Sequence, residues 1–321
     1  EEHGAGGGAS RLITGDHPEY AALETSLAAL KGTADAVVFG SGYLANLGIL
    51  PALMDRHDLI LADKLNHACL VDSARLAGAR VVRYPHADME ALRARLARYR
   101  GRYRHCLIVT DGVFSMDGDL APLPEIAALA REFDAWLMTD DAHGVGVVGD
   151  GAGSTAAMGL TAADVPLQMG TLSKAVGGYG GYLCADAPVV DWIRTRARSF
   201  IYTTALPPAT VAGDRAAVER IRRDPDLCRR PLALARRLAA ALGLPEPESP
   251  IVPVILGEDA TAVAAQQDLA AAGFLVQAIR PPTVPEGTAR LRLTCRAPHT
   301  EADMDALAAA LKPLLPAGGA A

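Results

Sequence analysis

Short apolar runs rich in β-branched residues recur along the first half of the chain, and segments with helical periodicity separate them. The clearest helical patterns cover residues 18–30, where the leucines fall on one stripe, and residues 122–133, which begin at a proline. Strands that alternate with helices form a mainly parallel sheet sandwiched by helices, so the pattern predicts an α/β fold. The expected strands cover residues 36–39, 59–62, 80–83, 106–110 and 136–139.

A second region begins after the string YTTALPPA at residues 202–209 with a helix-rich stretch full of Ala and Arg. Mixed helices and strands follow, which predicts a smaller C-terminal α+β domain. We place the boundary near residue 215, so that a large domain covers residues 1–215 and the smaller one residues 216–321, with a poorly ordered tail from residue 316. The elements expected there are strands at residues 251–256, 275–279 and 289–294, and helices at residues 261–272 and 301–315.

Composition argues against several classes of protein. Half of the residues are hydrophobic, yet no uninterrupted apolar run approaches the ~20 residues that span a bilayer, and no secretory signal opens the chain. The net charge of −6 and the scattered basic residues do not favour nucleic-acid binding. The five cysteines lack metal-ligand spacing, so we expect reduced thiols, mostly in the core, and no metal site. We therefore expect a soluble, cytoplasmic protein.

Lys174 is the first candidate for a chemical role. It lies in GTLSKAVGG (170–178), an apolar and glycine-rich setting after an expected strand, and it is one of only four lysines. Burial there would disfavour the ammonium form and leave the free amine that forms an imine with an aldehyde. A lysine considered alone more often pairs with a carboxylate, so its neighbours decide between the two interpretations.

The string DDAHG (140–144) follows an expected buried strand, at the position where open α/β sheets bind ligands. Asp140 could keep a pyridine nitrogen protonated, so that the ring withdraws electrons, and His143 could reach a ring hydroxyl. A metal site or a helix cap could use the same residue types, but we find no convincing set of further metal ligands.

A glycine-rich turn offers a phosphate site. Gly42 and Tyr43 open an expected helix, whose first backbone N–H groups can bind a phosphate, and Thr171 could add a hydroxyl. Strand-to-helix turns also need glycine for shape alone. His67, in NHACL (66–70), could lie against a flat cofactor ring, although a lone histidine is more often structural.

Two more segments contain candidate ligand groups. Ser115, in DGVFSMDGD (111–119), follows a strand at the same expected sheet edge as Asp140 and could bond the cofactor. The proline-rich loop IRPPTVP (279–285) presents Arg280, whose guanidinium suits a carboxylate. An ordinary turn is the alternative for this loop.

Together these segments resemble the α-oxoamine synthase family, pyridoxal-phosphate enzymes with the aspartate aminotransferase fold of type I. The family pattern starts further towards the N-terminus, so the resemblance implies that an N-terminal segment is missing, and Asp111 stands where glutamate is more familiar. The most discriminating string is IRPPTVPEGTARLRLT (279–294). The other matching strings, in family order, are SGYLAN (41–46), NHACL (66–70), DGVFSMDGD (111–119), DDAHG (140–144), GTLSK (170–174) and YTTALPPA (202–209).

The resemblance implies a role for each candidate. Lys174 would bind pyridoxal 5'-phosphate as a Schiff base and act with His67 and Asp140 in catalysis, Asp140 as the partner of the pyridine nitrogen. The amino-acid substrate would meet His67, Arg280 and Thr283. Further contacts to the cofactor are implied for Gly42, Tyr43, Ser115, His143, Thr171, Thr203 and Thr204, the last two across the interface of a homodimer.

The implied reaction is the decarboxylative condensation of L-alanine with a pimeloyl thioester, carried by coenzyme A or an acyl carrier protein, in biotin biosynthesis. Within the same family, glycine or serine could react with other acyl thioesters instead. Transamination or β-elimination on the same fold, and a cofactor-binding remnant without activity, are the remaining alternatives.

Overall fold

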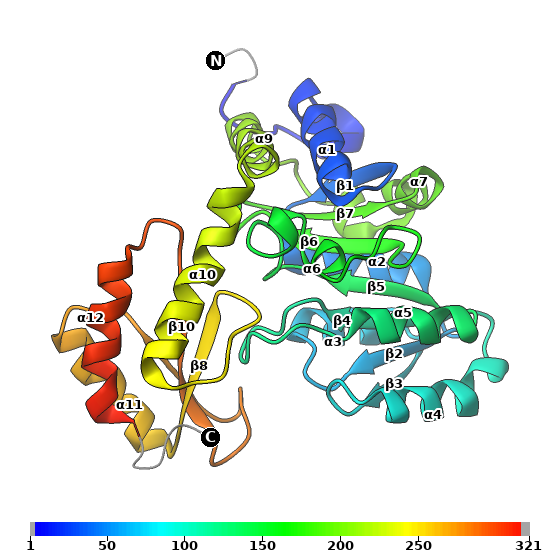
Figure 1. The fold of residues 1–321 in the computed structure, drawn as a ribbon. Coiled ribbons are helices and arrows are strands. Elements are labelled where there is room, and N and C mark those ends of the chain that lie inside the picture. The colour runs from blue at the N-terminus through cyan, green and yellow to red at the C-terminus, as the bar shows by residue number, and fades with distance from the viewer. Residues whose placement is uncertain (1–3, 316–321) are drawn as a thin grey trace. The chain divides into compact units, whose positions relative to one another are not determined.

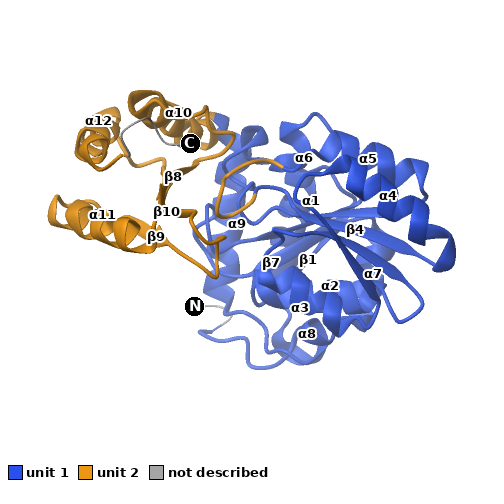
Figure 2. Ribbon diagram, turned by 90° about the horizontal axis from the view of Figure 1, so that it is seen from below, with its two compact units in different colours: residues 1–113, 121–225 blue, residues 114–120, 226–321 orange. Residues whose placement is uncertain are grey.

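The computed structural model describes residues 4–315 and divides into two compact units. The first, blue in Figure 2, comprises residues 1–113 and 121–225, and the second, orange, comprises residues 114–120 and 226–321. The boundary predicted near residue 215 falls inside helix α9 (Pro208–Arg223). The prediction for the tail from residue 316 concerns residues outside the described range.

A seven-stranded sheet forms the centre of the first unit (Figure 1). Its strands are parallel except β7, which runs antiparallel to both of its neighbours, β1 and β6. The predicted α/β fold with a mainly parallel sheet is therefore confirmed, and each of the five predicted strands lies within an observed one. In spatial order the strands are β1 (Asp35–Phe39), β7 (Gly181–Ala185), β6 (Leu167–Thr171), β5 (Trp136–Asp140), β4 (Cys106–Asp111), β2 (Leu59–Asp63) and β3 (Arg80–Tyr84).

Helices cover both faces of this sheet, as Figure 2 shows. Successive strand residues point to opposite faces, so one row of side chains, including Val37, Ile60 and Val109, packs under α2, α3, α7 and α8. Each fully buried aliphatic side chain contributes about 1.5–3 kcal/mol. The helices of that face are α2 (Gly42–Leu53), α3 (Ala68–Leu76), α7 (Ala187–Arg196) and α8 (Arg198–Ile201). The remaining helices are α4 (Met89–Tyr99), α5 (Leu123–Glu132), α6 (Ser154–Ala157) and α1 (Pro18–Lys31). Helix α1 packs on α9.

The second unit contains a three-stranded antiparallel sheet in the order β8-β10-β9, packed against helices around its own apolar core. Strand β9 is shorter than predicted because only residues 277–279 pair with β10, while Leu275 is fully exposed. The elements are β8 (Ile251–Gly257), β9 (Gln277–Ile279), β10 (Ala289–Thr294), α10 (Pro225–Leu242), α11 (Asp259–Ala271) and α12 (Glu301–Leu311). Short helical turns at Arg11–Gly15, Arg100–Arg102, Gly149–Gly151 and Lys312–Leu314 complete the chain.

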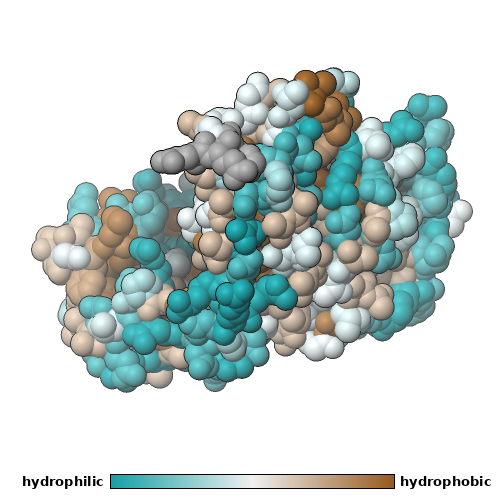
Figure 3. Space-filling model, turned by 90° about the horizontal axis from the view of Figure 1, so that it is seen from above, coloured by the Kyte–Doolittle hydropathy of each residue, from teal (hydrophilic) through white to brown (hydrophobic). Residues whose placement is uncertain are grey.

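The hydropathy of the surface and the burial of the cysteines agree with what the composition predicts. Within residues 4–315, no helix has the length and apolar character that crossing a membrane requires. The face drawn in Figure 3 intersperses hydrophilic residues with smaller apolar groups. All five cysteines are buried, as expected for core thiols.

Candidate active site

Three parallel strands of the central sheet end in a buried acid, and the acids of the neighbouring strands β4 and β5 are candidates for the site. Parallel strands β4 and β5 end at Asp111 and Asp140, which are direct partners in the strand register. Asp111 is 4% exposed and Asp140 is 5% exposed. The two acids therefore lie side by side at the edge where ligands of open α/β sheets bind.

Asp140 receives hydrogen bonds on both of its carboxylate oxygens. Asn46 Nδ2, from helix α2, donates to Oδ2 at 2.8 Å, and the backbone N–H of Ala142 donates to Oδ1 at 3.0 Å. Burial raises the pKa of Asp140, while these two bonds and the charge of Lys174 act in the opposite direction. We did not predict Asn46, although its amide in the apolar string SGYLAN was a signal for it.

Asp111 has weaker support for a negative charge. Its Oδ2 accepts a hydrogen bond from the backbone N–H of His67 at 3.2 Å, and its own N–H donates to Asn66 Oδ1 at 3.1 Å. Burial, followed by the charge of Asp140, raises the pKa of Asp111 well above its ordinary value. Two adjacent buried acids do not both ionise readily, and Asp140 accepts two hydrogen bonds whereas Asp111 accepts one, so the hydrogen bonds favour the charged form at Asp140.

Lys174 lies in the loop that joins β6 to β7. Its Nζ is 2.9 Å from His143 Nε2, and its positive charge lowers the pKa of both Asp111 and Asp140. The structure thus brings together the lysine, the histidine and the acid that we singled out. The expected burial of Lys174 is wrong: the side chain is exposed, because residues 173–175 extend past the end of β6.

Thr171 is the last residue of β6 and precedes the loop of residues 172–180, which contains Lys174 and is called the lysine loop below. Its hydroxyl donates to the carbonyl oxygen of Gly180 at 2.8 Å, and the backbone N–H of Leu172 donates to the same oxygen at 3.0 Å. The Thr171 proton is therefore used within the loop. Ser173 Oγ lies 2.8 Å from Thr171 Oγ1 and is more exposed, which makes it a further candidate ligand group that we did not predict.

Asp214, from α9, contacts the end of the lysine loop that precedes β7. Its Oδ1 accepts a hydrogen bond from the backbone N–H of Tyr179 at 3.1 Å. A Cβ atom at Gly178 would lie only 1.6 Å from the same oxygen, so this position has room for glycine alone. Burial raises the pKa of Asp214 to about 6. This acid, too, was not predicted.

Helix α2 begins with its N-terminus beside Thr171. Ser41 caps the helix by accepting a hydrogen bond from the backbone N–H of Leu44 at 3.2 Å. A Cβ atom at Gly42 would lie 3.3 Å from Thr171 Oγ1, so glycine keeps the helix end close to that strand. The first N–H groups of a helix have no intrahelical partner, so this end could bind an anion, and the phosphate contacts of Gly42 and Tyr43 stay predictions. The Tyr43 hydroxyl donates to Asp72 at 2.7 Å.

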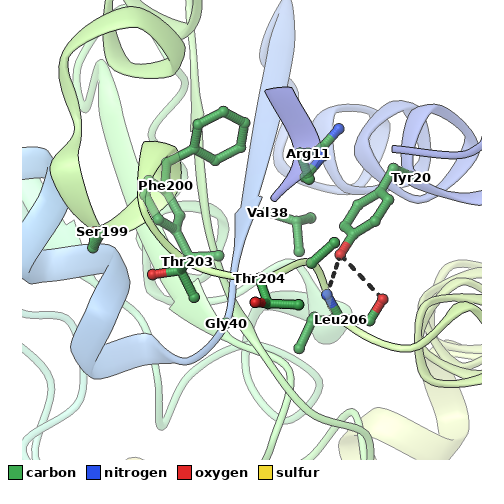
Figure 4. A pocket seen from close by; sticks show the side chains of 11 residues that line it. Arg11, Tyr20, Val38, Gly40, Ser199, Phe200, Thr203, Thr204 and Leu206 are labelled. Carbon is green, nitrogen blue, oxygen red and sulfur yellow. Dashed lines mark hydrogen bonds between the residues drawn. The ribbon is translucent and has the colours of Figure 1, made fainter. Parts of the chain in front are cut away.

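A small pocket contains the predicted Thr203 and Thr204 (Figure 4). Thr203 approaches Gly40, since a Cβ atom at that glycine would lie 3.7 Å from the threonine methyl group. Thr204 forms an isolated β-bridge with Ser10. The described chain alone does not test their predicted contact across a dimer. The other lining residues are Arg11, Tyr20, Val38, Phe39, Ser199, Phe200, Ala205 and Leu206.

Three predicted residues belong to the second unit. Ser115 lies in the segment 114–120, where Arg292 donates a hydrogen bond to its carbonyl oxygen and Arg290 forms an ion pair with Asp117. Arg280 and Thr283 are exposed and share a turn, in which the Thr283 N–H donates to the Arg280 carbonyl oxygen at 3.0 Å. Their roles stay predictions.

Asp141, the second acid of DDAHG, is structural. Its carboxylate accepts from Lys31 Nζ at 2.7 Å and from the backbone N–H of Ser154 at 3.1 Å, and both charged side chains are fully buried. This ion pair anchors the turn that follows β5, which positions both Asp140 and His143. Among residues 4–315, no group of three or more His, Cys, Asp or Glu side chains is arranged to hold a metal ion.

Comparisons with known proteins agree with these features. The model of the aminotransferase class I and II family matches residues 1–311. An 8-amino-7-oxononanoate synthase of Maricaulis maris is 58% identical over 320 residues, which cover 100% of this chain and 81% of the relative.

Solved structures extend the comparison to the fold. Serine palmitoyltransferase (SPT) with a PLP internal aldimine superposes with a TM-score of 0.93 at 33% identity, covering 97% of this chain and 80% of the other. An 8-amino-7-oxononanoate synthase from Francisella tularensis has a TM-score of 0.79 at 28% identity, covering 93% and 87%. The resemblance predicted from the motif strings is confirmed. The chain belongs to the aminotransferase class I and II family, within the group of the 8-amino-7-oxononanoate synthases.

Proposed function

We propose that the chain condenses L-alanine with a pimeloyl thioester, giving 8-amino-7-oxononanoate, carbon dioxide and a free thiol in biotin biosynthesis. The identity of 58% to a synthase of that name over the whole chain supports this reaction. The observation that carries the chemistry is the amine of Lys174, 2.9 Å from His143 Nε2 and close enough to Asp140 to lower the pKa of that acid.

Pyridoxal 5'-phosphate is the cofactor of this proposal, and the residues present fit it. Asp140 is a buried carboxylate that suits a protonated pyridine nitrogen, Lys174 offers the amine for the aldehyde, and the N-terminus of α2 at Gly42 suits the phosphate. His143, whose Nε2 lies 2.9 Å from Lys174 Nζ, would meet the ring hydroxyl. When bound, the cofactor supplies an electron-withdrawing ring that stabilises negative charge on the substrate.

The side chains of the chain then divide the proton transfers. Lys174, as a free amine, would take the proton from the α-carbon of alanine and later return one. Its contact with His143 holds the amine in place during these transfers. The hydrogen bonds from Asn46 and from the backbone N–H of Ala142 support a negative charge on Asp140, which would make it the electrostatic partner of the ring.

Binding of the two substrates uses the remaining predicted residues. His67 contacts the amino acid, and Arg280 with Thr283 takes its carboxylate, for which a guanidinium is the suited donor. Ser115 supports the cofactor, while Thr203 and Thr204 serve the phosphate of the partner subunit in a homodimer. The pimeloyl group arrives on coenzyme A or on an acyl carrier protein.

The test uses the full chain loaded with pyridoxal phosphate. Each of L-alanine, glycine and L-serine is mixed with pimeloyl, acetyl, succinyl or palmitoyl thioesters, and the product is identified by mass while thiol release is followed. We expect 8-amino-7-oxononanoate from alanine with the pimeloyl donor. A preference for another pair, or a keto acid formed without thiol release, would contradict the proposal.

Two variants of Lys174 distinguish the role of its amine from that of its positive charge. Lys174→Ala removes both, and Lys174→Arg keeps the charge but cannot form an imine. Both are expected to lose turnover, while a Lys64→Ala control at an exposed lysine keeps it. Full turnover in Lys174→Ala would remove this lysine from the mechanism.

A further inference from the structure

A buried thiol connects three groups of the candidate site. Cys69, in the first turn of α3, is 4% exposed. Its sulfur lies 2.9 Å from His67 Nδ1, 3.1 Å from Asn46 Nδ2 and 3.8 Å from Asp140 Oδ2. A buried cysteine is ordinarily a small apolar core residue, but this sulfur faces a polar group on each of three elements.

The number of hydrogen atoms on each group determines which atom donates and which accepts in each hydrogen bond. The Asn46 amide has two N–H bonds, and it directs one to Asp140 Oδ2 and the other to the sulfur of Cys69. The sulfur is therefore an acceptor for Asn46. With both donors engaged, the amide has one orientation, in which it faces the Asp140 carboxylate.

The same argument, from which atoms can donate a hydrogen bond, assigns the tautomer of His67. This residue is the N-cap of α3, and its Nδ1 accepts the backbone N–H of Cys69 at 3.2 Å. A backbone N–H can only donate, so Nδ1 has no proton of its own, and the proton of the neutral ring is on Nε2. The single S–H of Cys69 can donate to Nδ1, 2.9 Å away, or to Asp140 Oδ2, 3.8 Å away, and the shorter distance favours Nδ1.

We propose that Cys69 is a positioning residue that holds His67 as the Nε2–H tautomer and orients Asn46 towards Asp140. The inference rests on the proposed function, in which His67 and Asp140 face the cofactor, and it adds the group that links them. The free edge of the His67 ring then presents a hydrogen-bond donor to the substrate. A fixed tautomer also gives the ring one orientation.

The thiol acts by position and not as a nucleophile. Burial, followed by the charge of Asp140, raises the pKa of Cys69 to about 12, so the sulfur keeps its proton at neutral pH. The S–H group therefore remains a hydrogen-bond donor. Substitution should change geometry without removing a reacting atom.

The direct test reads the tautomer in the full chain before cofactor or substrate is added. Long-range ¹H–¹⁵N spectra of the histidine rings distinguish Nε2–H from Nδ1–H, and a His67→Gln variant identifies the signal. We expect the Nε2–H pattern in the parent protein. In Cys69→Ala the backbone N–H of residue 69 still donates to Nδ1, so the Nε2–H form should stay the major one, with a smaller Nδ1–H fraction that the lost thiol no longer suppresses. Cys69→Ser, which keeps a donor and an acceptor, should restore the single pattern.

Cys106→Ala is the matched control, because Cys106 is an equally buried thiol at the opposite end of strand β4. It removes the same atoms without touching His67, so it should leave the His67 signal unchanged. An Nδ1–H pattern in the parent protein, or a His67 spectrum that is identical in Cys69→Ala and the parent, would overturn the proposal. If Cys69→Ala does not fold, the parent and Cys69→Ser spectra still decide the tautomer.

The kinetic test follows the condensation reaction. Loss of hydrogen bonds of this kind is expected to lower kcat/KM about three- to tenfold in Cys69→Ala, with recovery in Cys69→Ser. The Cys106→Ala rate should match that of the parent. Because the tautomer is measured without substrate, a tautomer shift in a protein that does not condense alanine would refute the proposed function and support the role of Cys69.

Discussion

Replacing Lys31 with methionine removes the charge that neutralises Asp141. The two side chains are both 0% exposed, and Lys31 Nζ lies 2.7 Å from Asp141 Oδ2. Methionine fills nearly the same volume, so the main effect is a buried carboxylate without its counter-charge. Breaking a buried pair in this way costs about 3–5 kcal/mol. At about 2–4 °C per kcal/mol for a domain of this size, Tm should fall by about 6–20 °C.

Differential scanning calorimetry of the chain without cofactor measures this change. The double variant Lys31→Met/Asp141→Asn removes the stranded charge but keeps an acceptor for the Ser154 N–H, so it should recover most of the lost stability. Lys64→Met, at an exposed lysine, is the control and should change stability by less than about 0.5 kcal/mol. A Lys31→Met variant that melts with the control, or a double variant no more stable than the single one, would refute the reasoning.

Other predictions concern the acids and the lysine loop. Asp140→Ala should lower turnover about 100-fold or more, measured against an unchanged far-UV spectrum, and near-normal turnover would deny its electrostatic role. Gly178→Ala should cost about 1–3 kcal/mol, because the new Cβ would meet Asp214, and adding Asp214→Ala should relieve the loss in urea unfolding. Burial raises the pKa of Asp214 from 3.8 to about 6, so between these values the folded protein binds a proton that the unfolded chain releases, and stability falls as pH rises. Asp214→Asn should flatten that fall in unfolding curves taken across the window, and identical pH slopes would contradict it.

Much of the sheet and its edge could be predicted from local pattern. Apolar β-branched runs mark the strands, and parallel strands bring their carboxyl ends to one edge, so the placement of Asp140 followed from the end of its strand. The identity of the family followed from the motif strings and was confirmed by the comparisons. Strand β7 was missed because its five residues, GYLCA, follow a glycine-rich loop and show no clear alternation.

The supporting contacts depend on tertiary packing. Asn46 and Asp140 are 94 positions apart, and Lys31 and Asp141 are 110 apart, so no local pattern links them. The apolar and glycine-rich neighbours of Lys174 suggested burial, whereas the loop leaves the sheet beyond β6. Glycine there serves the approach of a carboxylate, as at Gly178, rather than an enclosed pocket.

The matched endings of β4 and β5 set a rule for how this protein can vary. Because side chains alternate between the two faces of a strand, inserting or deleting one residue within either strand would turn Asp111 or Asp140 towards the opposite layer of helices. Substitutions of apolar residues in these strands change the packing gradually, but a change in the length of either strand would separate the two acids. The number of residues in each strand is therefore as restrictive as the identity of the acid at its end.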